Sequence, residues 1–473
     1  MAKRVRVYLV TTAILLASFS SAANAAVKAG ASCTKPGAIS TSNGYKFTCI
    51  KSGKKLNWNK GVKVANPKPT VVSTPTSVPT ATPVPTPSFV ITPTTSLADV
   101  STCKLNRPNG QNGISLGFPI FPERVKGPII RALIMPVDFP DLIATTDPAL
   151  DYKEMTLQIS KWYSTLSGNR VKFEWVIYPK YIRMPQTVAS YNVGARTGTG
   201  YGTYHDESIR AGDAYIDFSK FDLVVMGAPP NVKSEQISTS PAFPVSAGGG
   251  IKVDGVEVLN STMTAEDSMR VQQDRPGWKL IAHEIGHLMG LMDLYNVHST
   301  MDASGKPPTD EQQFKFMGGF AMMNHVHGNA PTFTAWEQWL LGFVPDSQIR
   351  CIASGSDEST HLIAPIELTT DSPHAVVISL SETKRIVIES RRSIGYDIAL
   401  GSSNEGALVY MVDITKSSGD GPISIIKKPD VKSPLLYDAL LKKGESITYE
   451  NYKITNLASD KNGDTIRVEK VAA

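Results

Sequence analysis

What the chain lacks excludes several classes of protein. Gly248-Gly249-Gly250 is not set between a strand and a helix as a phosphate-binding loop requires. There is no G-x-S-x-G elbow, so a serine hydrolase is not supported. The net charge of +5 is small and no Lys/Arg block follows the N-terminus, so neither nucleic acid nor a membrane surface is indicated as a partner. After the first 25 residues, no segment of the sequence is apolar over a length that would span a membrane.

The first 25 residues predict a secretory signal. Lys3, Arg4 and Arg6 form a basic start, residues 7–17 are apolar, and residues 23–25 give an A-x-A cleavage site. An uncleaved anchor helix is the alternative, but the apolar stretch is short for a bilayer. We therefore expect a secreted, extracellular protein that is released or held only by cell-wall contacts.

Cysteine is scarce, with 4 residues in the chain. An even number in an exported protein predicts two disulfides. Cys33 and Cys49 are natural partners because they lie close together in sequence. Cys103 and Cys351 would then tie together the two ends of the region between them. The alternative for Cys103 is a thiolate that blocks a metal site in a latent form, which would leave Cys351 unpaired.

Histidine is also rare, with 8 residues, yet two of them belong to the pattern H-E-x-x-H-x-x-G-x-x-D that begins at His283. Residues four apart share one face of a helix, so His283 and His287 can bind the same zinc ion. Gly290 permits a sharp turn that brings Asp293 to the ion as a third ligand. Glu284 can take a proton from zinc-bound water. Three ligands and an open position are typical of a catalytic zinc site.

Simpler interpretations compete with each of these assignments. The pattern could be an amphipathic helix with two stray histidines, although the added glycine and aspartate make this much rarer by chance. Asp293 could be a turn former, in which case His298 or a more distant carboxylate would supply the third ligand. His325, His327 and Tyr295 are candidate donors to the transition-state oxyanion, though each residue type is more often an ordinary polar or packing side chain.

The chain divides into five expected parts. Residues 1–25 are the signal peptide, and residues 26–61 form a small two-cysteine module. Residues 62–100 are a Pro/Thr-rich linker that cannot build a packed core and should be extended. Residues 101–345 form the catalytic domain, and residues 346–473 form a β-rich domain.

Strands and helices mix in the catalytic region, which predicts an α/β (α+β) fold. We expect strands at 129–138, 171–178 and 221–226, and helices at 150–166, 204–216 and 277–290. Residues 227–262 should be loops and edge strands over the cleft. Further strands are expected at 375–380, 385–389, 406–413, 447–455 and 465–470. Asn462-Gly463 predicts a hairpin turn rather than a calcium loop.

Several segments resemble secreted metalloproteases of the immune inhibitor A type, the M6 peptidases. Besides the zinc helix, the segments that carry the resemblance are VDFPD at 137–141, WYSTLS at 162–167, IDFSKFD at 216–222, FMGG at 316–319, PTFTAW at 331–336, IESRR at 388–392, GYD at 395–397 and LVYMVD at 408–413. The resemblance covers about 127–415, and only the zinc helix with its aspartate is highly specific.

The resemblance implies a zincin-like fold and a zinc endopeptidase that cuts proteins outside the cell. Its metal ligands would be His283, His287 and Asp293, and Glu284 would be the general base. The family often binds structural calcium as well, but no clear calcium ligand cluster is visible in this sequence.

A methionine turn beneath the metal is also implied by the resemblance. Met317 matches it best, with Met322 and Met323 as close rivals.

We therefore expect a secreted zinc hydrolase that cleaves protein or peptide substrates by Glu-assisted attack of zinc-bound water. One alternative is a catalytically inactive surface-binding protein on a protease scaffold, which predicts damage to the ligands or the base, whereas all are intact. Another is a processing or wall-remodelling hydrolase of narrow specificity, which the sequence does not separate from a general protease. The cell wall or surface is the partner considered for the N-terminal module.

Overall fold

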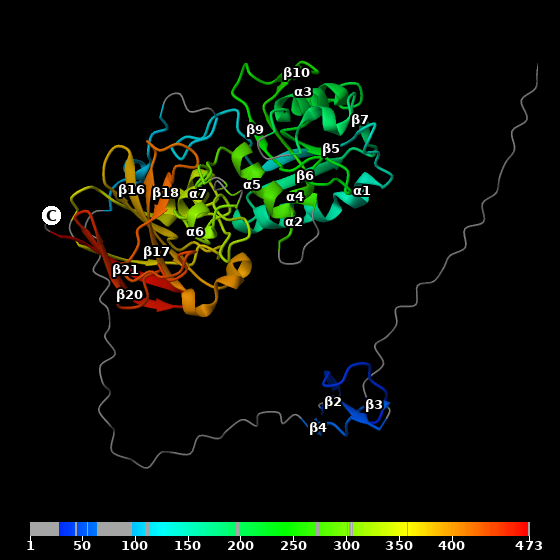
Figure 1. Cartoon of the computed structure of the whole chain (residues 1–473). Helices are drawn as coiled ribbons and strands as arrows, with labels where there is room; N and C mark the ends of the chain where they lie inside the picture. Colours follow the sequence, from blue (N-terminus) through cyan, green and yellow to red (C-terminus); the bar gives the residue numbers. More distant parts are fainter. Residues whose placement is uncertain are drawn as a thin grey trace, which may run out of the picture. The chain divides into compact units, whose positions relative to one another are not determined.

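The structure is a computed structural model of the chain, and its contacts divide it into two compact units, residues 1–88 and 89–473 (Figure 1). The expected signal peptide and most of the expected linker lie outside the described residues. The structure describes residues 28–42, 45–53, 55–63, 97–108, 113–194, 198–269, 275–299, 301, 304, 306–356 and 358–471.

The N-terminal unit contains a small antiparallel sheet. Its strands are β1 (Ile39–Ser42), β2 (Tyr45–Ser52), β3 (Lys55–Trp58) and β4 (Val62–Lys63), with β2 paired to each of the others. Phe47 and Cys49 on β2 are its buried side chains. The Cys33–Cys49 disulfide is confirmed, and it joins the loop before β1 to this central strand. A sheet this small buries little apolar surface, so the bridge contributes to its stability.

The second unit begins with a mixed sheet in the order β6-β5-β8-β12-β9, to which β7 adds by pairing with β5. Strands β5, β6, β8 and β12 run parallel, and β9 is an antiparallel edge. The strands of this part are β5 (Ile129–Asp138), β6 (Lys172–Ile177), β7 (Ile182–Arg183), β8 (Leu223–Gly227), β9 (Ala242–Pro244), β12 (Asn260–Met263) and the hairpin β10 (Ile251–Val253) and β11 (Val256–Val258).

Helices cover both faces of this sheet because alternate residues of a strand point to opposite sides. On β5, Ile130 and Ile134 join the core that contains α2 and α5, whereas Leu133 and Met135 join the core that contains α3. The helices are α1 (Pro148–Asp151), α2 (Lys153–Leu166), α3 (Tyr201–Gly212), α4 (Glu266–Met269), α5 (Trp278–Leu288), α6 (Asp310–Gln313) and α7 (Ala335–Leu340). The 3-10 helices are η1 (Val100–Cys103), η2 (Val188–Tyr191), η3 (Phe218–Lys220), η4 (Asp346–Gln348), η5 (Gly395–Leu400) and η6 (Ser402–Asn404).

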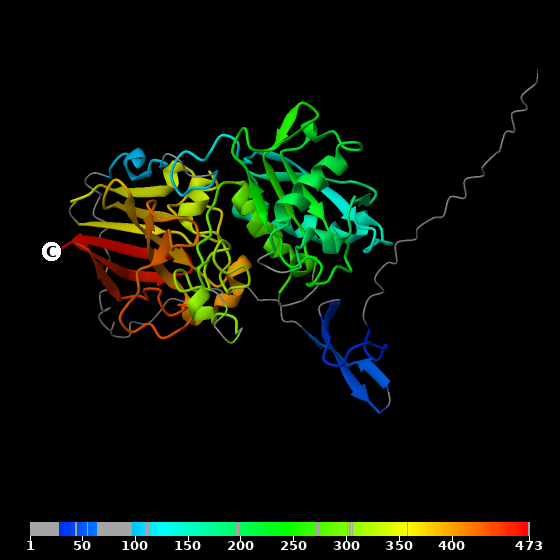
Figure 2. The same cartoon turned by 45° about the horizontal axis from the view of Figure 1, so that its top comes forward.

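The C-terminal part is built from two sheets, in the orders β13-β15-β16-β17-β18 and β14-β21-β20-β19. Figure 2 shows this part in yellow to red beside the green part that carries α5. Its strands are β13 (Ile349–Ile352), β14 (Ser359–Ile363), β15 (Ala375–Ser379), β16 (Lys384–Arg391), β17 (Gly406–Asp413), β18 (Ile423–Ile425), β19 (Ser446–Tyr449), β20 (Tyr452–Asp460) and β21 (Gly463–Lys470).

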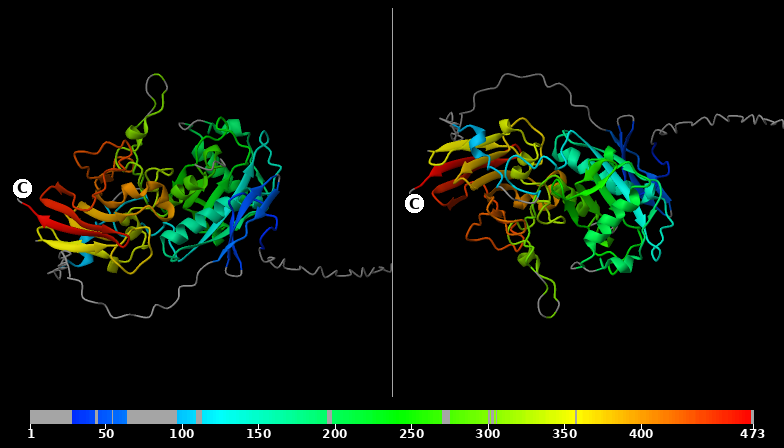
Figure 3. Two further views of the ribbon diagram at one scale, coloured as in Figure 1. Left: turned by 90° about the horizontal axis from the view of Figure 1, so that it is seen from below. Right: turned by 90° about the horizontal axis from the view of Figure 1, so that it is seen from above.

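One face of the first sheet packs against the second sheet, and the other face packs against the α/β part. Val376 and Ile388 lie in the core between the two sheets, whereas Val387 and Tyr410 lie in the core that also contains the buried face of α5. The views from below and above in Figure 3 show the β-rich and α/β parts directly beside each other. The two parts therefore share one continuous hydrophobic core.

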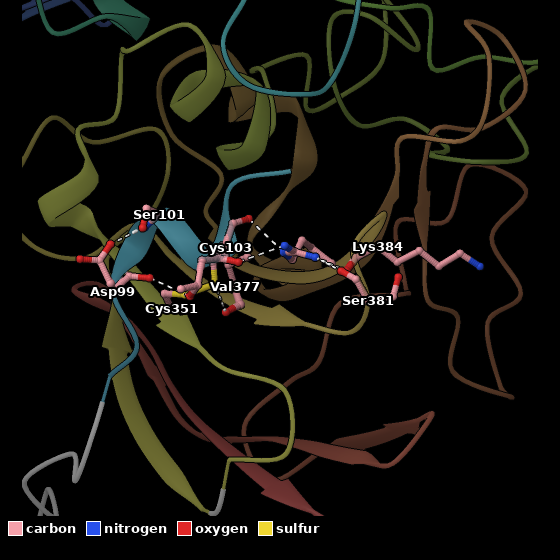
Figure 4. Close-up of a disulfide and its surroundings, with 9 residues drawn as sticks. Asp99, Ser101, Cys103, Cys351, Val377, Ser381 and Lys384 are labelled. Atoms are coloured by element: carbon pink, nitrogen blue, oxygen red, sulfur yellow. Dashed lines mark hydrogen bonds between the residues drawn. A yellow bond between two sulfur atoms is a disulfide. The ribbon is translucent and has the colours of Figure 1, made fainter. Parts of the chain in front are cut away.

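The Cys103–Cys351 disulfide is confirmed as well (Figure 4). It joins η1 to β13 across 248 residues of sequence, so it ties together the ends of the α/β region as expected. Arg385 on β16 donates to the carbonyl oxygens of Thr102 and Cys103 at 3.0 Å each. The alternative role of Cys103 as a thiolate that blocks a metal is wrong here, because its sulfur belongs to the bridge.

Most expected elements form, with four main differences. The helix expected at 150–166 forms as two helices, α1 and α2, separated at Tyr152. The helix expected at 204–216 begins earlier and ends earlier, as Tyr201–Gly212. Residues 447–455 are not one strand but the hairpin β19–β20, because Glu450 adopts a left-handed φ of 52° and turns the chain. β12, in the region expected to be loops and edge strands, is instead a buried inner strand.

The turn expected at Asn462-Gly463 does join two paired strands, β20 and β21. Within the described residues, no helix is long and apolar enough to cross a membrane.

Candidate metal centre

The helix α5 is buried on several sides. Ile281, Ala282, Ile285 and Leu288 are fully buried in the shared core. The phenol of Tyr163 on α2 donates to the carbonyl oxygen of Ala282 at 2.8 Å, next to the first histidine of the motif. Apolar packing and this bond hold the helix in one orientation, so the side chains on its remaining face have fixed positions.

The helix ends in a turn that explains the glycine of the motif. Gly290 has φ 102°, a left-handed conformation that costs glycine little. Its N–H donates to the carbonyl of His287 at 2.9 Å, and the N–H of Leu291 donates to the carbonyl of Gly286 at 3.0 Å. These are the two bonds of a Schellman motif, which satisfies the last carbonyls of a helix and reverses the chain. The reversal brings Asp293 back beside the helix.

Three predicted ligands meet at this point. His283 Nε2 lies 3.1 Å from Asp293 Oδ1, and His287 Nε2 lies 3.2 Å from the same oxygen. The two imidazole planes stand at 88° to each other, with centroids 4.9 Å apart. Among the residues that the structure describes, these three form the group whose ligand atoms, all within 4.8 Å of one another, could hold a metal ion.

The other ring nitrogens are also engaged. His283 Nδ1 lies 2.9 Å from the carbonyl oxygen of Met322, and His287 Nδ1 lies 2.9 Å from the carbonyl oxygen of Leu291. Because a carbonyl oxygen only accepts hydrogen bonds, each Nδ1 must carry the proton and donate it. A neutral ring then presents an unprotonated Nε2, the form in which histidine binds metals.

This arrangement fits a zinc ion. An unprotonated Nε2 and a carboxylate oxygen are both hydrogen-bond acceptors, so they do not attract each other directly. The short distances from Asp293 to the two histidines therefore require either that both rings are protonated or that a cation lies between the three groups. Ligand bonds of about 2.1 Å at tetrahedral angles place neighbouring ligand atoms about 3.4 Å apart. The observed 3.1 Å and 3.2 Å are within a few tenths of an ångström of that spacing.

Without an ion, the charges of the site shift one another's pKa values. Burial opposes a charge on His287, but the carboxylate of Asp293 outweighs it and raises the pKa of His287 to about 9. Burial also opposes a charge on His283, but its hydrogen bond to Asp293 outweighs burial and raises the pKa of His283. Burial alone would raise the pKa of Asp293, yet the two histidines hold it well below its usual range. Without an ion, the site therefore keeps Asp293 ionised and a proton on His287, and a metal ion that binds there would displace that proton.

Glu284 lies in the wall of a cleft of about 590 Å³ that is also lined by the three predicted ligands. Burial raises its pKa to about 7, although the two neighbouring histidines oppose the shift. A carboxyl group whose pKa is near neutral can both accept and return a proton at neutral pH.

The candidate donors lie in the same cleft. Tyr295, His325 and His327 all line it. The His325 ring stacks on Phe314 with centroids 3.9 Å apart and planes 8° apart, which fixes its orientation. Burial lowers the pKa of His325 to about 4, so the ring is neutral at neutral pH. His298, the alternative third ligand, instead pairs with Asp420 on the surface at 2.8 Å with 71% of its side chain exposed.

Of the three methionines considered for the methionine turn, Met323 lies nearest to the helix backbone between the two histidines. A Cβ built on Gly286, between the two histidines, would lie 2.5 Å from the sulfur of Met323. The carbonyl of Met322 holds His283. Met317 is fully buried in the shared core. The contacts favour Met323, one of the two rivals of Met317, and the methionine turn itself stays a prediction.

The site also depends on residues that the sequence pattern did not indicate. Ser418 Oγ lies 2.8 Å from the backbone nitrogen of Asp293 and 3.3 Å from its Oδ2. Ser418 is 125 residues away in the sequence, in a Ser- and Gly-containing turn typical of any hairpin. No local signal in the sequence distinguishes it.

Comparison with known proteins adds little. No protein-family model and no curated protein matches the chain. Among solved structures, one similar chain is the catalytically inactive OgpA of Akkermansia muciniphila in complex with an O-glycopeptide substrate, at 12% sequence identity and a TM-score of 0.24. The match covers 79% of this chain and 96% of that one. A similarity of this degree carries no argument about fold or function.

Proposed function

We propose that this protein is a zinc-dependent endopeptidase with a zincin-like catalytic part. The single observation that carries the proposal is the convergence of His283 Nε2, His287 Nε2 and Asp293 Oδ1 in a cleft whose wall includes Glu284. The resemblance to M6 peptidases supports the same conclusion. Secretion, which the N-terminal sequence predicts, belongs to this proposal.

Each residue has a defined task in that reaction. His283, His287 and Asp293 would hold the ion, which would supply Lewis-acid polarisation of the scissile carbonyl and lower the pKa of water. Glu284, in the wall of the same cleft, takes a proton from a water molecule there and passes it to the leaving amine.

The cleft suits a peptide substrate. Its volume of about 590 Å³ accommodates several side chains, and its wall combines polar groups with the apolar Leu280 and Phe314. His325, oriented on Phe314, is the donor we favour for the developing oxyanion, because a neutral imidazole needs no compensating charge.

Replacing Glu284 with Gln tests the proposal. We expect purified wild-type protein to contain about one zinc ion per chain and to cleave a denatured protein substrate in a chelator-sensitive manner. The Glu284→Gln variant should keep its zinc and lose activity by about 10²–10⁴-fold, the usual contribution of a general base. Zinc content by mass spectrometry and peptide mapping measure both. Full activity in metal-free protein, or unchanged turnover in the variant, would contradict the proposal.

A further inference from the structure

The loop between β17 and β18 belongs to the β-rich part, yet it reaches the third ligand of the metal centre. Besides the two contacts of Ser418, the N–H of Gly419 donates to the carbonyl oxygen of Asp293 at 2.9 Å. Asp293 is therefore held at its backbone nitrogen, its backbone oxygen and its side chain by two consecutive residues of another part of the fold.

The side-chain contact selects one carboxylate oxygen. Oδ1 of Asp293 faces both histidines, whereas Oδ2 faces the hydroxyl of Ser418 at 3.3 Å. An ionised carboxylate accepts hydrogen bonds, so the hydroxyl is the donor in this contact. A carboxylate that rotates freely about its last torsion presents either oxygen to a cation, and a donor bound to one oxygen removes that freedom.

The loop itself is built to stay in place. Asp413 Oδ1 accepts hydrogen bonds from the backbone N–H and the hydroxyl of Thr415, at 3.0 Å and 2.6 Å. Gly419 has φ 81°, and a Cβ there would meet Val297 at 2.3 Å. The close approach of this loop to the chain after the zinc helix therefore requires glycine.

The same hairpin also contacts the segment near the methionines. The N–H of Ile425 on β18 donates to the carbonyl of Phe316 at 2.9 Å, and a Cβ on Gly421 would meet the Phe316 ring at 2.5 Å. One hairpin of the β-rich part thus packs against both chain segments that flank the metal centre.

From these contacts we infer that Ser418 is a positioning residue of the metal centre, and that the β17–β18 hairpin of the β-rich part completes the zinc site through Asp293. The inference rests on the proposed function. It means that the β-rich part is not an accessory module, because the third ligand is oriented only when this hairpin is in place.

Zinc affinity of the full-length protein tests this directly. A hydrogen-bonding partner of a metal ligand typically contributes 10–100-fold to metal affinity, so Ser418→Ala should weaken zinc binding by about that factor in competition with a chromophoric chelator. Ser418→Thr, which keeps the hydroxyl, should bind zinc more tightly than Ser418→Ala. Ser417→Ala, in the exposed neighbouring position, is the matched control and should bind zinc like the wild type.

A double-mutant cycle separates positioning from a general effect on folding. If Ser418 acts through the carboxylate of Asp293, the double variant Ser418→Ala/Asp293→Ala should bind zinc with an affinity within about 2-fold of that of Asp293→Ala alone. An equal loss in both backgrounds would overturn the inference. So would wild-type affinity in Ser418→Ala. Wild-type protein that binds no zinc would instead overturn the proposed function, and the positioning role with it.

Discussion

The most instructive perturbation is the removal of a buried cation, Arg391→Met. Arg391 on β16 is fully buried, with Nε 2.6 Å from Glu389 Oε1 and Nη1 2.7 Å from Asp397 Oδ2. Both carboxylates are fully buried as well, so one guanidinium compensates two negative charges within the core.

Those carboxylates in turn hold the segment that leads into α7. Glu389 Oε2 accepts the N–H of Ala335 at 2.6 Å, and Asp397 Oδ1 accepts the N–H of Thr332 at 2.9 Å. Removing one partner of a buried ion pair costs about 3–5 kcal/mol, because a charge is left uncompensated away from water. We expect a loss of at least this size for Arg391→Met, since two carboxylates lose their partner.

Urea unfolding followed by tryptophan fluorescence measures the change in the free energy of unfolding. The matched control is Arg131→Met, which removes an exposed ion pair with Asp222 and should cost about 0–1 kcal/mol. Adding Glu389→Gln and Asp397→Asn to Arg391→Met should recover part of the loss, because the uncompensated charges disappear. Equal midpoints for Arg391→Met and Arg131→Met, or no recovery in the triple variant, would refute this reasoning.

Two further predictions concern stability. Replacing both Cys103 and Cys351 with Ala should lower the free energy of unfolding of the second unit by about 2–5 kcal/mol. Replacing Cys33 and Cys49 with Ala should leave the unfolding transition of the second unit unchanged. Thermal melts compare the two variants, and identical shifts of that transition would contradict the assignment of the two disulfides to separate units. Burial lowers the pKa of His361 from 6.5 to about 4. As the pH drops, His361 therefore takes up a proton in the unfolded chain before it does so in the folded protein. The free energy of unfolding should then fall by up to about 3 kcal/mol between about pH 6.5 and pH 4. His361→Gln should lessen the decline between urea midpoints at pH 7 and pH 5, and an identical decline would argue against this origin.

Local patterns were sufficient for much of the fold. The apolar run at 129–138 forms β5 with the expected bounds, because a buried parallel strand is apolar on both faces. The pattern at 150–166 forms α1 and α2, with Ile159 and Trp162 buried. The alternation of apolar and polar residues at 447–455 did not reveal the turn between β19 and β20, because that turn depends on the left-handed φ of the single residue Glu450.

The candidate site divides in the same way. Histidines four apart on a helix and a glycine that ends it are local features, so His283, His287 and the reversal at Gly290 are readable without coordinates. The sequence left Met317, Met322 and Met323 open for the position beneath the helix, because packing against Gly286 depends on how a distant loop folds back.

By itself, the sequence determined the types and spacing of the candidate ligands and the helix that carries two of them, because hydrogen bonding along the backbone acts over a few residues. Only the tertiary structure decided that Asp293 is held by Ser418 and Gly419, and that the β-rich part shares a core with α5. Contacts between residues 125 positions apart depend on how sheets and helices pack, and no local pattern encodes that packing.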